Sequence, residues 1–137
     1  MRTNKPILLV EDDRIDAMTV QRALKDIKVL NELIIRENGE EALEFLRDDS
    51  NVKPAIILLD LNMPRMNGTE FLEAAKLDEA IKKIPVIVLT TSHEEWDRLQ
   101  SFNLGAAGYM VKPVDYQQFV EVIRVVDLYW TISELPD

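Results

Sequence analysis

The sequence contains no cysteine and only one histidine, His93, among its 137 residues. The lack of cysteine excludes disulfides, thiolate nucleophiles and zinc or iron–sulfur sites with cysteine ligands. A single histidine is too few for a histidine-rich metal site. These two absences remove most soft-ligand metal chemistry and all cysteine-based catalysis from consideration.

Basic residues and long apolar runs are also scarce. The chain has 16 Lys and Arg against 25 Asp and Glu, a formal net charge of -9, which argues against a protein that binds a nucleic-acid backbone. No apolar stretch approaches the roughly 20 residues of a membrane span, and the N-terminus lacks the layout of a signal peptide. We therefore expect a cytoplasmic protein with neither nucleic-acid nor membrane partners.

Short apolar runs alternate with helix-like patterns along the whole chain. The runs that predict buried strands are 7–10, 33–35, 55–59, 86–89 and 108–111. The segments that predict helices are 15–27, 40–47, 69–77, 94–104 and 116–130. Such alternation indicates a single α/β domain with a parallel sheet covered on both faces. We expect this domain over 5–128, a C-terminal extension over 129–137 and no output domain.

Apolar residues recur at three- and four-residue spacings along the first predicted helix and are more numerous on the last. In the first helix these are Ile15, Met18, Ala23, Leu24 and Ile27. The last helix is apolar around more than half of its girth, and burial on the sheet is expected for Phe119, Val122, Ile123 and Val126. Tyr129 and Trp130 follow late in this helix, where aromatic residues indicate a partner surface.

Acidic residues follow two of the predicted strands. Glu11, Asp12 and Asp13 come after the first strand, and Asp60 ends the third. Ligands of open α/β sheets bind outside the carboxyl ends of the strands, so Asp12, Asp13 and Asp60 converge if the two strands are neighbours. Such a cluster repels itself, which a hard cation such as Mg²⁺ resolves. Lys112, just past the fifth strand, can add a second cation.

The acids also have a simpler interpretation. Aspartate is a good N-cap, so the three residues after the first strand can equally serve to start a helix. Asp60 alone is also ambiguous. The combination of both acidic positions with Lys112 at a further strand end favours the cation site.

Four sequence blocks match a known family in the right order. They are 7–13 (ILLVEDD), 58–68 (LLDLNMPRMNG), 85–92 (PVIVLTTS) and 105–113 (GAAGYMVKP). Over about residues 5–128 the chain resembles the receiver domains of bacterial two-component response regulators. The resemblance implies a flavodoxin-like doubly wound fold, with a five-stranded parallel sheet in the order 2-1-3-4-5 and five helices.

The resemblance also implies a role for each acidic residue. Asp60 would be the phosphoacceptor, a carboxylate nucleophile that takes a phosphoryl group from a sensor histidine kinase. Asp13, Asp60 and the backbone carbonyl of Asn62 would ligate Mg²⁺, and Asp12 would act through a bound water. Phosphoryl transfer needs positioning and charge neutralisation above all, which this residue set can supply.

Three further residues would complete the site. Lys112 would pair with one phosphoryl oxygen, its orientation set by a cis peptide bond before Pro113, and Thr90 would hydrogen-bond another oxygen. Tyr109 resembles the aromatic switch of the family, which turns inward as the threonine moves toward the phosphate. Outside this family context, Thr90 and Tyr109 would be ordinary packing residues at a strand end and an edge strand.

The last residues narrow the resemblance. Residues 88–93 and 129–136 resemble receivers without output domains that are coupled to bacterial phytochromes and related sensor kinases. Those proteins dimerise through the face formed by the fourth helix, fifth strand and fifth helix. We therefore expect a homodimer through the last helix, with Tyr129 and Trp130 near its centre and signalling through protein–protein contacts to an unknown target.

Two other functions remain open at this stage. The first is an Mg²⁺-dependent aspartyl-phosphate phosphatase or phosphotransferase, but such enzymes often carry a second acid where this chain has Asn62. The second is a receiver-like scaffold that is not phosphorylated, although none of the phosphorylation residues is missing. We expect a signalling domain that is not an enzyme, apart from slow self-dephosphorylation.

Overall fold

The computed structural model describes residues 4–61, 66, 68–90, 106, 108–112 and 115–133, with side chains of the last segment as far as Leu128. The predicted helix over 94–104 lies outside these residues. Among the described helices, none is long and apolar enough to cross a membrane.

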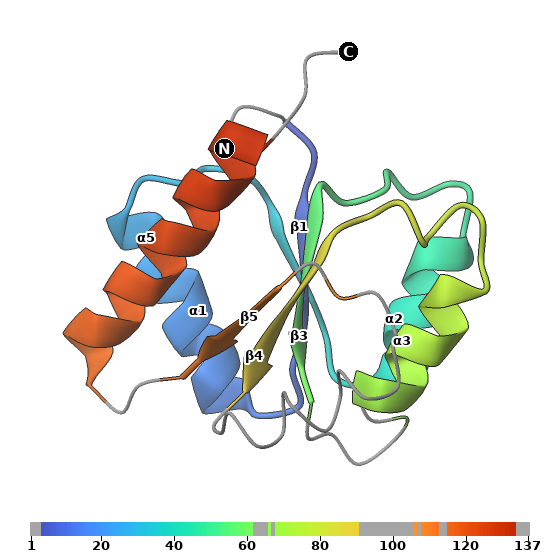
Figure 1. Cartoon of the computed structure of the whole chain (residues 1–137), viewed down its shortest axis with the longest axis horizontal. Coiled ribbons are helices and arrows are strands. Elements are labelled where there is room, and N and C mark those ends of the chain that lie inside the picture. The colour runs from blue at the N-terminus through green and yellow to red at the C-terminus, as the bar shows by residue number, and fades with distance from the viewer. Residues whose placement is uncertain are drawn as a thin grey trace.

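Five parallel strands form one sheet in the order β2-β1-β3-β4-β5, as expected (Figure 1). The strands are β1 (Ile7–Val10), β2 (Leu33–Arg36), β3 (Ile56–Asp60), β4 (Val86–Thr90) and β5 (Gly108–Val111). The described helices are α1 (Arg14–Asp26), α2 (Gly39–Arg47), α3 (Gly68–Lys76) and α5 (Tyr116–Ser133). Helices α1 and α5 cover one face of the sheet, and α2 and α3 cover the other.

The strand residues alternate between two cores, as a sheet covered on both faces requires. Leu8 and Val10 of β1 pack toward α2 and α3, whereas Ile7 and Leu9 pack toward α1 and α5. Strands β1, β3 and β4 are buried along their whole length, while β2 and β5 at the two edges are only half-buried. The three central strands therefore form the rigid part of the sheet.

The register of the sheet brings its carboxyl ends to a common edge. Val10 pairs with Leu59, so the residue after β1 lies level with Asp60 at the end of β3. On the other side of β3, Thr90 at the end of β4 pairs with Val111. The chain leaving β5 stays close, because the Lys112 amide donates to the Thr90 carbonyl at 2.7 Å.

The apolar residues of the first helix do not all lie on its buried face. Ile15 and Met18 are 74% and 61% exposed, and the buried residues of α1 are Ala17, Val20, Ala23 and Leu24. Ile15 precedes Ala17 by two residues, about 200° around a helix of 3.6 residues per turn, so the two side chains face opposite ways. The buried face of α1 is therefore formed by these four residues, while Ile15 and Met18 face solvent.

The last helix packs on the sheet nearly as predicted. Phe119, Ile123 and Val126 are buried, whereas Val122 is only half-buried, and Val120 is buried in addition. The start of α5 is attached to α1, since the Tyr116 hydroxyl donates to Asp26 at 2.6 Å and the Arg22 guanidinium stacks 4.2 Å from the Tyr116 ring. These two contacts hold the start of α5 against α1.

Gly68 at the start of α3 provides a test of this packing. A Cβ atom there would lie 2.8 Å from Leu61 Cα and 3.1 Å from the Asp60 carbonyl oxygen, and backbone atoms cannot yield cheaply. We expect Gly68→Ala to lower the free energy of unfolding by about 1–3 kcal/mol. At Gly108 a Cβ would meet only Ile87 Cδ1 at 3.6 Å, so Gly108→Ala is the matched control. Urea denaturation of both variants measures the difference in their free energy of unfolding. Equal stabilities would contradict the close packing of Gly68 against Leu61 and Asp60.

Candidate functional site

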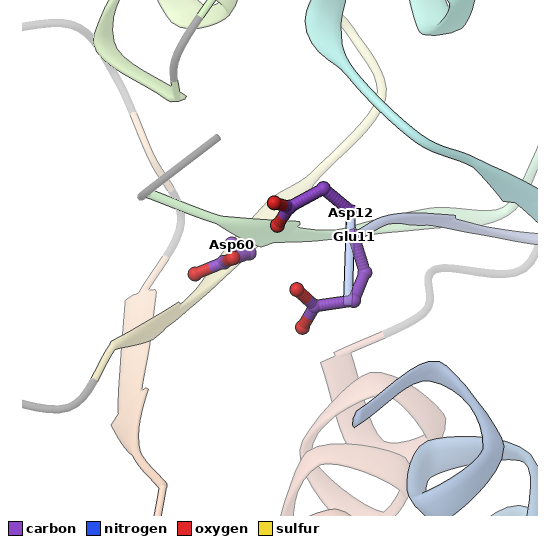
Figure 2. A group of neighbouring side chains, drawn as sticks. All are labelled: Glu11, Asp12 and Asp60. Atoms are coloured by element: carbon purple, nitrogen blue, oxygen red, sulfur yellow. The ribbon is translucent and has the colours of Figure 1, made fainter. Parts of the chain in front are cut away.

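Three carboxylates converge where β1 and β3 end. Oxygen atoms of Glu11, Asp12 and Asp60 all lie within 4.8 Å of one another. Figure 2 shows Glu11 and Asp12, which directly follow β1, beside Asp60 at the end of β3. Glu11 and Asp60 are buried, and Asp12 is exposed. The group therefore has two acids in the protein interior and one facing solvent.

Lys112 is the cation that faces these acids. Its Nζ atom donates to Glu11 Oε1 at 2.9 Å and lies 3.7 Å from Asp60 Oδ1. A third carboxylate, Asp16 of α1, lies 3.6 Å from the same nitrogen. The lysine side chain is only 15% exposed, so its charge acts within the site and is not spread into solvent.

The other predicted site residues divide into described and undescribed positions. Thr90 is buried at the end of β4, and Tyr109 is half-buried on β5 and packs against the core beneath α2 and α3. Asn62, His93 and the peptide bond before Pro113 lie outside the described residues. So do the side chains of Tyr129 and Trp130, although their backbone belongs to α5.

Comparison with known proteins settles the family. Residues 7–124 match the model of the response regulator receiver domain. The chain belongs to that family. It is a signalling module of two-component systems, and its five-stranded sheet has the order expected of a receiver domain.

Close relatives of this receiver domain include phytochrome response regulators. This chain is 38% identical over 130 residues to Response regulator Rcp1 of Synechocystis sp., and the match covers 92% of this chain and 88% of Rcp1. The phosphorylated cyanobacterial phytochrome response regulator RcpA matches with a TM-score of 0.87 at 35% identity, covering 98% of this chain and all of RcpA. The Mn²⁺-bound structure of Rcp1 matches with a TM-score of 0.83 at 37% identity, covering 97% of this chain and 99% of that one.

The receiver site contains a different acid set from the one predicted. Asp13, expected to ligate the metal, caps α1 instead: its Oδ1 accepts from the amides of Ile15 at 2.8 Å and Asp16 at 3.0 Å. Glu11, to which no role was assigned, occupies the site. Strand β1 ends at Val10, so the two residues after it reach the sheet edge and the third begins the helix. The predicted convergence of Asp13 with Asp60 was therefore wrong by one residue, while the metal role of each acid stays a prediction.

Burial and charge shape the ionisation of this site. Burial first, and then the interaction with Asp60, raise the pKa of Glu11 to about 8 against the opposing effect of Lys112. Burial alone would lower the pKa of Lys112, but the charges of Glu11 and Asp60 raise it above its ordinary value. The lysine therefore stays charged at neutral pH, and a further cation at the site would lower the pKa of Glu11.

The donor set is suited to a hard divalent cation. Carboxylate oxygens are the preferred ligands of Mg²⁺ and Mn²⁺, and one lysine does not neutralise three converging acids. Receiver domains bind Mg²⁺ at this acidic pocket, and the Rcp1 structure holds Mn²⁺. The residues present here therefore fit the metal of the family.

The raised pKa of Glu11 predicts how stability depends on pH in the metal-free protein. A carboxyl group whose folded pKa exceeds its unfolded value of 4.5 stabilises the fold below pH 4.5, and this contribution is lost as the pH rises through about 8. Each pKa unit corresponds to about 1.4 kcal/mol. We expect parent stability relative to Glu11→Gln to fall by about 2–4 kcal/mol between pH 5 and pH 8.

Chemical denaturation in EDTA at several pH values measures this difference. The control is Glu44→Gln, because Glu44 lies exposed on α2. If the parent and Glu11→Gln show parallel stability curves, Glu11 is ionised throughout the range and the assignment fails.

Proposed function

We propose that this receiver domain accepts a phosphoryl group on Asp60 from a sensor histidine kinase. The observation that supports this most is the position of Asp60: it ends β3 beside Asp12, with the Lys112 ammonium 3.7 Å from its carboxylate. A buried carboxylate between a metal-type acid cluster and a fixed cation is arranged to act as a nucleophile toward phosphorus. The protein would then act by changing its contacts with other proteins.

The transfer requires little covalent chemistry from the protein. An Asp60 oxygen forms the new bond to phosphorus as the bond between phosphorus and the histidine nitrogen of the kinase breaks, and the imidazole keeps the electron pair. Lys112 would pair with the phosphoryl oxygens, and the Thr90 hydroxyl would donate to another. Mg²⁺ held by Asp12 and Asp60, with the Asn62 carbonyl as a proposed third ligand, would neutralise charge on the transferring group.

A signalling role is favoured over turnover of external phosphoesters. The position two residues after Asp60 is Asn62, so a general acid or base of the kind that phosphatases use there is missing from the sequence. Hydrolysis of the Asp60 phosphate would therefore be slow. We infer a phosphoacceptor domain and not a phosphatase or phosphotransferase enzyme.

The kinase is proposed from two of the relatives described above. RcpA and Rcp1 match along nearly the whole chain, and RcpA is named as a phytochrome response regulator. We propose a phytochrome-type or related sensor histidine kinase as the donor. Such a transfer would take place in the cytoplasm, where the kinase domain of a two-component system meets its receiver.

The phosphoacceptor assignment predicts a clear loss of labelling. Asp60→Asn should take up no phosphoryl group from acetyl phosphate in Mg²⁺, because the amide is not a nucleophile toward phosphorus. EDTA should prevent labelling of the parent. Intact-mass spectrometry detects the added phosphoryl group, and Asp48→Asn, at an exposed acid after α2, is the control that should label normally. Full labelling of Asp60→Asn would place the acceptor elsewhere.

Helix α5 supports the further proposal of a homodimer. Val125 and Leu128 are 51% and 56% exposed on this helix, and Tyr129 and Trp130 follow in the same helix. Exposed apolar residues gathered on one element are typical of protein interfaces. We propose a two-fold interface through α5, with the aromatic pair near its centre. Tyr109 on β5, which packs on the sheet face covered by α2 and α3, is the proposed switch residue.

The dimer is tested by placing a charge on α5. Leu128→Glu should shift a dimer toward monomer in analytical ultracentrifugation, because a central interface residue commonly contributes about 2 kcal/mol, or roughly thirtyfold in affinity. Leu30→Glu is the matched control, since Leu30 is 91% exposed in the turn between α1 and β2. A parent that is monomeric at high micromolar concentration, with or without phosphorylation, would end the proposal.

A further inference from the structure

Lys112 is shared among three carboxylates, and one of them lies outside the metal-type cluster. Asp16 is in the first turn of α1, and its Oδ2 atom lies 3.6 Å from Lys112 Nζ, nearly the same distance as Asp60 Oδ1 at 3.7 Å. Two acids from different elements therefore compete for the same ammonium before any phosphoryl group is present. The lysine already donates to a third acid, Glu11, at 2.9 Å.

The position of Asp16 has a simpler explanation, which the contacts do not favour. An acid in the first turn of a helix is stabilised by the helix dipole, and this would account for Asp16 without Lys112. The helix start is, however, already capped: Asp13 Oδ1 accepts from both the Ile15 and Asp16 amides. The Asp16 carboxylate itself lies 3.6 Å from the Lys112 ammonium.

Asp16 differs from Glu11 in how easily its contact can be exchanged. The Glu11 side chain is 1% exposed, whereas that of Asp16 is 50% exposed. A half-exposed carboxylate can give up an ion pair and return to water at a smaller cost than a buried one. Asp16 is therefore the partner that Lys112 can leave when the charge on Asp60 increases.

We propose that Asp16 is a positioning residue that holds Lys112 back from Asp60 and so slows uptake of the phosphoryl group. This inference rests on the proposed phosphoacceptor function of Asp60. The ammonium must turn from its carboxylate partners toward the incoming phosphoryl oxygens, and each competing carboxylate opposes that movement. Removing the Asp16 charge leaves Lys112 with one competing carboxylate fewer and so favours its approach to Asp60.

The rate of labelling by acetyl phosphate at low ionic strength and saturating Mg²⁺ tests this proposal. Acetate leaves as the bond from Asp60 to phosphorus forms, so no kinase contact is involved. Asp16→Asn should label about threefold faster than the parent, the size expected of one partly screened unit charge at this separation. Asp16→Glu, which restores the carboxylate, should label at nearly the parent rate. Glu44→Gln removes an equal charge on exposed α2 and should change nothing.

A second background separates positioning from simple repulsion of the anionic donor. In Lys112→Met the repulsion by Asp16 remains, but there is no ammonium to position, so adding Asp16→Asn should give no further gain. An undiminished threefold gain in that background, or no gain in Asp16→Asn alone, would overturn the proposal. A parent that takes up no phosphoryl group would instead contradict the function proposed for Asp60.

If Lys112→Met labels too slowly to measure, a readout without phosphorylation tests whether Asp16 acts on Lys112. The lysine side-chain NMR signal of Lys112, assigned by its loss in Lys112→Met, should shift in Asp16→Asn and stay in place in Glu44→Gln. An unchanged signal in Asp16→Asn means that the carboxylate does not act on the lysine, and it would overturn the proposal by itself.

Discussion

The ion pair between Lys112 and the acids at the carboxyl ends of β1 and β3 is the interaction on which this site depends. Burying a carboxylate without a partner is costly, and two of the converging acids, Glu11 and Asp60, are buried. The lysine reaches them from the far edge of the sheet, with its amide bonded to the end of β4 and its ammonium 2.9 Å from Glu11. One cation from β5 thus allows acids on two central strands to stay inside the protein, while an excess of negative charge is left for a metal ion.

The fold was predictable because its signals are local and repeated. Four consecutive apolar residues in Ile7–Val10, and similar runs in the other strands, can be buried only in a sheet covered on both faces. The order of the strands was not contained in those runs and came from the resemblance to receiver domains. Helix faces were harder: α1 buries Ala17 and exposes Ile15, because apolar residues occur on both of its faces and their spacing alone does not decide between them.

The sequence predicts the correct edge of the sheet for the site but not which of the three successive acids converge there. The sequence shows three successive acids after β1, and any two of them could form the cluster with Asp60. The deciding fact is where the strand ends and the helix begins: the third acid, Asp13, accepts from two amides of α1 and is not among the converging carboxylates. The contact of Asp16 with Lys112 joins positions 96 residues apart in the chain, and only the folded sheet brings them together.

The distribution of burial indicates how a change of charge at Asp60 would affect the surface of the protein. The acids stand on central strands that are buried throughout, whereas Lys112 follows β5, a half-buried edge strand that also carries Tyr109. Elements with less buried contact move at lower free-energy cost. Under the proposed function, added charge at Asp60 would pull on the lysine, and the responding element would be the edge strand and not the core. Helix α5 begins four residues after Lys112 and is held to α1 through Tyr116, so a displacement of this strand end would be passed to the helix whose exposed face carries Val125 and Leu128.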